Sequence, residues 1–190
     1  MDHLGFEADT ATPADVASTW HRGCPVPIAD LARVRMNHLG FDGELHRGEL
    51  VVAARWVTDV CRIFAVALAE EFPIRMMLNP NEFGGDDDAM MEADNTSCFN
   101  YRVVAGTNRV SKHGLGTAVD INPRENPYLG PLGWTPPSGL RFVDRSLAEQ
   151  GMHHPDGVFV REFLAMGGRW GADFDDYHHF EFEHPARRVG

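Results

Sequence analysis

The sequence predicts a mixed domain of helices and strands, of the α+β class. Two strand-like segments, residues 31–38 and 44–52, flank a turn-rich sequence at 40–43, which is typical of an antiparallel hairpin. Apolar side chains recur at helical spacing across residues 55–72, and a proline follows directly. Residues 117–122 alternate apolar side chains with others, as a half-buried strand does. These patterns fit the α+β class but do not by themselves single it out.

Shorter elements are predicted between and beside these segments. Strand-like runs occur at residues 74–78, 101–104 and 179–182. Helical patterns occur at residues 13–17 and at 156–166, where two glycines follow the second one. These helices are expected to pack behind the strands.

Two long segments are predicted to be irregular loops. Residues 126–139 contain four of the 12 prolines, and residues 79–95 are rich in Asn, Gly and Asp. The second loop includes Asp86, Asp87 and Asp88. A solvated acidic loop is favoured here over a calcium site, because the fixed ligand spacing of a calcium loop is missing.

The bulk composition predicts one ordinary globular domain. The chain has 190 residues, of which 43% are hydrophobic and 24% charged. Residues 1–12 are expected to form a flexible tail and residues 13–190 a single domain. The formal net charge is -11, from 17 Lys and Arg against 28 Asp and Glu, which argues against nucleic acid as a partner.

Neither a secretory signal nor a membrane span is visible in the sequence. Residues 1–12 contain acids and no apolar run, so the chain either acts without its own export signal or has lost a leader. The longest apolar run, residues 63–69, is far shorter than the roughly 20 residues that cross a bilayer. We therefore expect a soluble protein, with a monomer as the default.

The three cysteines do not predict a disulfide framework or a thiolate metal site. Cys24, Cys61 and Cys98 are too few and too widely spaced for either, although one pair could form a bridge. Cys61 lies in an apolar helical stretch and is expected to be a small core residue.

The most informative segment is residues 111–122. Gly114 and Gly116 allow a sharp turn between His113 and Asp120. An imidazole and a carboxylate that converge here are two plausible ligands for zinc, which in catalytic sites takes three protein groups and keeps one position for water. A third ligand is therefore needed.

The best candidate for the third ligand lies near the C-terminus. In a strand at residues 179–182, His179 and Glu181 share one face. His179 is expected to be the ligand, with Glu181 behind it to orient a ligand. Asp176, three positions before His179, is expected to be a general base.

Together the two segments resemble the D-alanyl-D-alanine carboxypeptidase family of zinc peptidases. This family includes the L-alanyl-D-glutamate endopeptidases of phage lysins and the vancomycin-resistance dipeptidases. Its pattern is Ser-x-His-x-x-Gly-x-Ala-x-Asp, followed much later by an acidic residue, two others and His-Phe-Glu. The matching residues are Ser111, His113, Gly116, Ala118, Asp120, Asp176, His179, Phe180 and Glu181. The resemblance extends from about residue 74 to residue 181.

The resemblance implies a central antiparallel sheet that carries a zinc site, with helices packed behind it, as in hedgehog-like and D-Ala-D-Ala peptidase folds. Zn²⁺ would be held by His113, Asp120 and His179. The resemblance also implies that Arg102 binds a substrate carboxylate or stabilises the oxyanion, and that Ser111 contacts the substrate. The alternatives are a surface ion pair for Arg102 and a bend-capping role for Ser111.

Two assignments near the C-terminus have competitors. Asp173 and Asp175 compete with Asp176 for the role of the base, and spacing alone favours Asp176. The family often has a proline where His178 stands. This departure leaves open a swapped role, in which His178 rather than His179 is a ligand or a proton donor.

The function implied by the resemblance is zinc-dependent hydrolysis of peptidoglycan stem peptides next to a D-amino acid. A D-alanyl-D-alanine carboxypeptidase is favoured, and an L-alanyl-D-glutamate endopeptidase is the alternative. This substrate class implies a place in the cell envelope or outside the cell. A non-catalytic cell-wall-binding module is disfavoured, because a pure binder needs no acid three residues before the last ligand. A structural zinc is disfavoured because such sites usually have four ligands, mostly thiolates.

Overall fold

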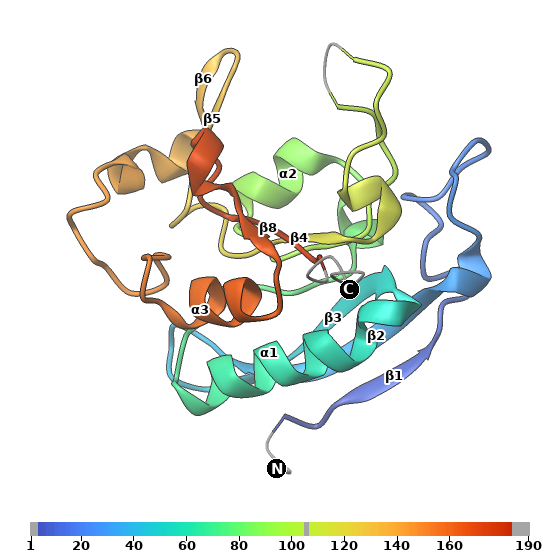
Figure 1. The fold of residues 1–190 in the computed structure, drawn as a ribbon, viewed down its shortest axis with the longest axis horizontal. Coiled ribbons are helices and arrows are strands. Elements are labelled where there is room, and N and C mark those ends of the chain that lie inside the picture. Colours follow the sequence, from blue (N-terminus) through green and yellow to red (C-terminus); the bar gives the residue numbers. More distant parts are fainter. Residues whose placement is uncertain (1–3, 105–106, 184–190) are drawn as a thin grey trace, which may run out of the picture.

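The computed structural model describes residues 4–104 and 107–183. The chain folds into a mixed α and β structure in which the strands form three small antiparallel sheets (Figure 1). Their strand orders are β1-β2-β3, β4-β8-β7 and β5-β6. In the described part of the chain, the one central sheet that we expected is thus divided into separate sheets.

The first sheet contains the predicted hairpin. Strands β2 (Leu31–Leu39) and β3 (Leu45–Ala53) pair along their whole length, which confirms this prediction. Strand β1 (Glu7–Thr10) pairs with β2 at the edge, so the prediction of a flexible tail is wrong for these four residues. Opposite charges face each other across this pair, as in the ion pair between Glu7 and Arg35 at 2.8 Å.

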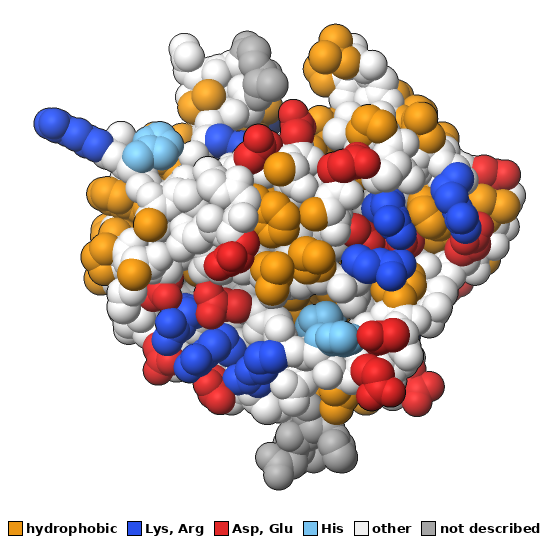
Figure 2. All heavy atoms as spheres, turned by 180° about the vertical axis from the view of Figure 1, so that it is seen from behind, with side chains coloured by type: hydrophobic (Ala, Val, Ile, Leu, Met, Phe, Trp, Pro, Cys, Tyr) orange, Lys and Arg blue, Asp and Glu red, His pale blue; other side chains and the backbone are white. Residues whose placement is uncertain are grey.

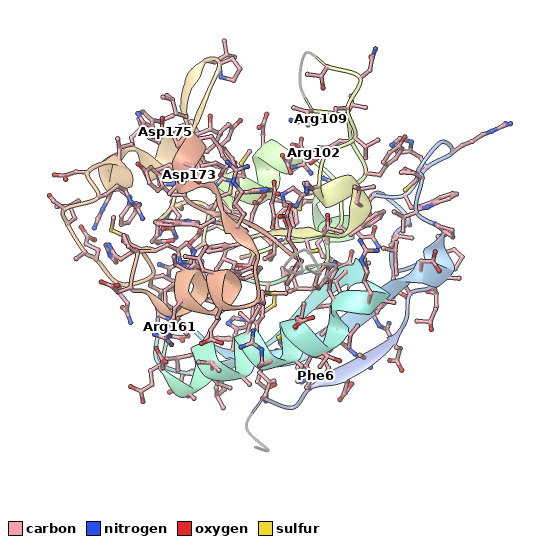
Figure 3. The ribbon with its side chains drawn as sticks, viewed as in Figure 1. Phe6, Arg102, Arg109, Arg161, Asp173 and Asp175 are labelled. Atoms are coloured by element: carbon pink, nitrogen blue, oxygen red, sulfur yellow. The ribbon has the colours of Figure 1, made fainter. Side chains whose placement is uncertain are left out.

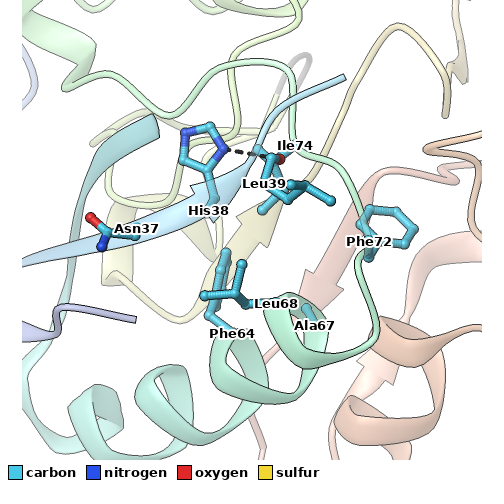
Figure 4. A pocket seen from close by; sticks show the side chains of 8 residues that line it. All are labelled: Asn37, His38, Leu39, Phe64, Ala67, Leu68, Phe72 and Ile74. Atoms are coloured by element: carbon cyan, nitrogen blue, oxygen red, sulfur yellow. Dashed lines mark hydrogen bonds between the residues drawn. The ribbon is translucent and has the colours of Figure 1, made fainter. Parts of the chain in front are cut away.

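Helices α1 (Val57–Ala69) and α3 (Val158–Ala165) confirm the two longer helix predictions, with shorter bounds. Phe64 of α1 packs edge-on against Phe159 of α3, with ring centroids 5.3 Å apart. The same face of α1 packs against β2, and Figure 4 shows Phe64 and neighbouring residues beneath His38.

The second sheet contains β4 (Ala118–Asp120), β7 (Arg169–Trp170) and β8 (His179–Glu181). The predicted strands at residues 117–122 and 179–182 are confirmed, again with shorter bounds. Their apolar residues join α1, α3 and the first sheet in one buried cluster, which includes Val119, Ile121, Phe180 and Phe182. The common core therefore holds β4 and β8 in a fixed position.

Three of the shorter predicted elements are wrong. Residues 13–17 form turns and not a helix. Residues 74–78 and 101–104 make only isolated bridges, such as Met76 with Asn95 and Val103 with Val110. A single bridge leaves most backbone groups unpaired with a neighbouring strand, so no strand is formed.

Both predicted loops contain regular structure. Residues 79–95 include α2 (Asp87–Glu92). Its first turn is capped by Asp86, whose Oδ1 accepts a hydrogen bond from the backbone amide of Ala89 at 3.1 Å. Residues 126–139 include the hairpin of β5 (Tyr128–Gly130) and β6 (Gly133–Thr135). In Figure 1 this hairpin projects from one end of the molecule.

Two further expectations concern cysteines and membranes. Cys24, Cys61 and Cys98 are all free thiols.

Within the described ranges, none of the helices combines the length and apolar character that a bilayer-spanning helix needs.

A buried acid pair links α2 to the loop that follows β4. Asp94 and Glu125 are each 1% exposed, and neither Asp94 Oδ2 nor Glu125 Oε2 makes a hydrogen bond to a described residue. Arg75 lies nearby, with Nε 3.5 Å from Asp94 Oδ2 and Nη2 3.6 Å from Glu125 Oε1. Burial and the neighbouring Glu125 raise the pKa of Asp94 to about 8.

Asp94→Asn is expected to flatten the pH dependence of stability. Between the ordinary carboxyl pKa of 3.8 and the folded value of about 8, only the folded chain binds this proton, so the free energy of unfolding falls as pH rises. An amide stays neutral, so the variant should gain about 1–2 kcal/mol relative to wild type on going from pH 5 to pH 8. Urea unfolding at both pH values checks this. Asp173→Asn, at a side chain that is 77% exposed, is the control, and equal slopes for wild type and Asp94→Asn would contradict the prediction.

Candidate metal centre

Three buried side chains from two distant segments meet at one point. His113 Nε2 lies 3.2 Å from Asp120 Oδ1, and His179 Nδ1 lies 3.0 Å from the same oxygen. The two nitrogens are 3.1 Å apart. Among the described residues, this is the one group of three or more His, Cys, Asp or Glu side chains close enough to share a metal ion. The structure thus brings together the three residues that we predicted as ligands.

Sheet register and a glycine turn place these side chains. Asp120 of β4 lies directly opposite His179 of β8 in the antiparallel pairing, so the two side chains are neighbours. His113 comes from a 3₁₀ turn that ends at Gly116, where φ is +63°. A Cβ atom at Gly116 would lie 2.6 Å from the backbone nitrogen of Ala53. Only glycine therefore allows β3 to approach this turn so closely.

The outward-facing nitrogens of both imidazoles have acceptors. His113 Nδ1 lies 2.7 Å from the carbonyl oxygen of Cys98, which can only accept a hydrogen bond. His179 Nε2 lies 3.5 Å from a carboxylate oxygen of Glu181, which in turn pairs with Lys112 at 3.2 Å. When each ring carries a single proton, that proton therefore belongs on the outer nitrogen, and His113 Nε2 and His179 Nδ1 each direct a lone pair towards Asp120.

The geometry of the three donors fits a small tetrahedral metal ion. Three electron-pair donors about 3 Å apart repel one another unless a cation or a proton lies between them. Zinc bonds of about 2.0–2.1 Å in tetrahedral geometry place ligand atoms about 3.3 Å apart. The observed distances of 3.0, 3.1 and 3.2 Å are close to this value. The group of His113, Asp120 and His179 can therefore hold a metal ion.

The charges of the group favour an ionised Asp120. Burial raises the pKa of Asp120, but the charges of His113 and His178 and hydrogen bonds from His113 and His179 outweigh it and lower the pKa well below 3.8. Burial lowers the pKa of His179, but hydrogen bonds to Asp120 and Glu181 raise it to about 10. The site therefore binds a proton strongly when no metal competes for it.

Asp176 lies beside this group, while its two competitors do not. Burial raises the pKa of Asp176, and the charges of His178 and His179 oppose this effect. Asp173 and Asp175 are exposed, and Figure 3 shows both on the segment that leads into β8. A half-buried group next to the donors is the better candidate for proton transfer to or from a bound substrate.

His178 lies near the centre but outside the group of three. Its Nε2 lies 3.1 Å from Asp176 Oδ1 and 3.8 Å from Asp120 Oδ1, whereas His179 Nδ1 lies 3.0 Å from Asp120 Oδ1. The shorter distance favours His179 over His178 as a ligand.

Arg102 and Ser111 have partners of their own in the structure. Arg102 pairs with Asp87 of α2 at 2.8 Å, and its Nη1 is buried with no hydrogen bond to a described residue. Ser111 Oγ accepts a hydrogen bond from the amide of His113 at 3.3 Å, as a turn-capping side chain does. The structure thus contains the alternative contact of each residue, an ion pair for Arg102 and a turn cap for Ser111. Their contacts with a substrate remain predictions.

Two segments connect to the residues around the centre. One comprises residues 101–104 and 107–110 and follows Asn100, whose amide donates to the carbonyl of His113 at 3.2 Å. The other is the β5–β6 hairpin, in which Tyr128 bridges to Asp176. Figure 2 shows a hollow between two projections, with acidic side chains at its base.

Several residues around the centre are absent from the sequence-based prediction. These are Lys112, which pairs with Glu181, and Asn126 and Arg145, which lie behind His178. The carbonyl of Cys98 is another. No spacing rule identifies them, because their contacts depend on how distant loops meet.

Comparison with known proteins supports a peptidase. Residues 105–182, less than half of the 190-residue chain, match a family model described as D-alanyl-D-alanine carboxypeptidase. The matched range contains His113, Asp120 and His179. Comparison with curated proteins and with solved structures gave no match. The segment that builds the metal centre is therefore similar to the D-alanyl-D-alanine carboxypeptidase family of peptidases.

Proposed function

We propose that the protein is a zinc-dependent peptidase that hydrolyses peptidoglycan stem peptides next to a D-amino acid. The observation that carries this proposal is the convergence of His113, Asp120 and His179 within 3.0–3.2 Å, inside a segment that matches a carboxypeptidase family. Two imidazoles and one carboxylate are typical of catalytic zinc sites, whereas structural sites usually close four ligands.

His113, Asp120 and His179 would hold the metal. Zinc in such a site supplies a position for water, lowers the pKa of that water towards neutrality and polarises the scissile carbonyl group. Glu181 fixes the outer nitrogen of His179, and the Cys98 carbonyl fixes that of His113, so both rings keep their lone pairs towards the centre.

Asp176 is the proposed general base and acid. It would take a proton during attack on the peptide bond and pass it to the leaving amine. Its partial burial supports this role by raising the pKa of its carboxyl group, because a carboxyl group with a raised pKa both accepts and returns a proton more readily near neutral pH.

The substrate assignment rests on the family. A D-alanyl-D-alanine carboxypeptidase releases a residue with a free carboxylate, and the buried Nη1 of Arg102 is a suitable donor for that group. The alternative bond lies between L-alanine and D-glutamate. Either substrate places the protein in the cell envelope or outside the cell.

The purified protein is expected to contain about one zinc per chain and to digest a defined stem peptide. Chelation should abolish digestion, and added zinc should restore it. Elemental analysis gives the metal content, and mass analysis of the products shows which bond is cut. Loss of terminal D-alanine supports the carboxypeptidase, cleavage after L-alanine supports the endopeptidase, and an intact peptide with bound zinc contradicts both.

A further inference from the structure

His178 is a buried imidazole beside the metal centre that the proposed metal site does not use. Its side chain is 3% exposed. Its Nδ1 lies 2.9 Å from the carbonyl oxygen of Asn126, and a carbonyl oxygen can only accept a hydrogen bond. The proton therefore belongs on Nδ1, and Nε2 is free to interact on the side of the metal centre.

The group that Nε2 meets there is Asp176. Nε2 lies 3.1 Å from Asp176 Oδ1, an atom that is buried and makes no hydrogen bond to any described residue. A buried oxygen without a partner is costly, so a small rotation of either side chain into a hydrogen bond is favourable. The contact with Asp120 is longer, at 3.8 Å.

The ring of His178 is held rigidly from behind. Asn126 Oδ1 accepts hydrogen bonds from the amide of His153 at 2.7 Å and from Arg145 Nη2 at 2.8 Å. Its Nδ2 donates to the carbonyl of Gly151 at 2.9 Å. With its side chain fully bonded, Asn126 presents its carbonyl to His178 in one fixed place.

A second contact fixes the other side of the ring. Tyr128 packs edge-on against His178, with ring centroids 5.7 Å apart, and its backbone bridges to Asp176. The hairpin β5–β6, the Asn126 loop and the segment before β8 therefore all converge on this imidazole.

We propose that His178 is a positioning residue for Asp176, which it holds towards the metal centre through a hydrogen bond between Nε2 and Oδ1. When Asp176 is ionised, the doubly protonated ring donates from Nε2, and when Asp176 is protonated, its hydroxyl donates to Nε2. This inference rests on the proposed role of Asp176 as the base. The arrangement is a property of this chain, because a proline at the same position has no side-chain nitrogen to make the contact.

Two substitutions at position 178 separate this role from simple packing. An asparagine side chain places its amide near the position of Nδ1, and a glutamine side chain places it near the position of Nε2. In the zinc-loaded protein, His178→Asn should therefore lower kcat about tenfold or more, whereas His178→Gln should stay within about threefold of wild type. KM and zinc content should change little in both variants. Equal losses in the two variants, unchanged kcat in His178→Asn, or loss of zinc from either would overturn the proposal.

A measurement without turnover distinguishes this inference from the peptidase proposal. In protein labelled with ¹⁵N-histidine, Asp176→Asn should shift the Nε2 resonance of His178. The ring of His153, which is buried and lies 3.2 Å from the carbonyl of Ile121, should be unaffected. If the His178 resonance shifts but the protein digests no stem peptide, the contact between His178 and Asp176 is supported and the peptidase proposal is contradicted. An unchanged His178 resonance contradicts the proposed contact, whether or not the protein is active.

Discussion

His179→Ala is expected to abolish stoichiometric zinc binding and, with it, peptidase activity. The substitution leaves only His113 Nε2 and Asp120 Oδ1, which are 3.2 Å apart, and two ligands do not hold zinc against water at micromolar metal concentrations. Partners behind the ligands typically contribute about 10–100-fold to metal affinity, so loss of a direct ligand should cost at least about 100-fold. Isothermal titration with zinc gives the affinity directly.

The same experiment has an internal check in its pH dependence. Without metal, hydrogen bonds to Asp120 and Glu181 outweigh burial and raise the pKa of His179 to about 10, so zinc must displace a proton. Wild-type affinity should therefore rise with pH from 6 to 8. His46→Ala, at an exposed ring that pairs with Asp42, should behave like wild type. Zinc bound one to one by His179→Ala would refute the proposed ligand set.

Sequence periodicity could place two of the three proposed ligands, Asp120 and His179, because both lie on strands with a fixed geometry. Alternation places His179 and Glu181 on one face of β8, and antiparallel register places Asp120 opposite His179. Only the convergence itself could not be derived from spacing. It depends on β4 and β8 being neighbours, although about 60 residues separate them in the chain.

The failures have a common physical cause. Segments 74–78 and 101–104 have strand-like composition, but the structure gives each only isolated bridges, and a strand needs a continuous partner. The β5–β6 hairpin forms within a proline-rich segment where composition indicates none. Arg102 illustrates the consequence for the site. Its partner Asp87 lies on α2, in a segment read as a loop, so an ion pair could be anticipated but this partner could not.

Asp176→Asn is expected to lower kcat by about 10²–10⁴-fold while zinc content and KM stay close to wild type. The amide has the same shape but cannot accept a proton from an attacking water, so the loss should appear in the chemical step. Asp176 is not among the three donors that meet at 3.0–3.2 Å, which is why the metal should remain.

The neighbouring acid supplies the matched control for this substitution. Asp175 is one residue away but exposed, and Asp175→Asn removes the same charge from the same segment. If net charge near the centre were what mattered, the two variants would lose similar activity. If proton transfer matters, only Asp176→Asn should be impaired. Of the two acids, only Asp176 is half-buried beside His178 and close enough to interact with the charges of His179 and Asp120. Full turnover by Asp176→Asn would assign the base to another group, and loss of zinc from this variant would instead make Asp176 a ligand.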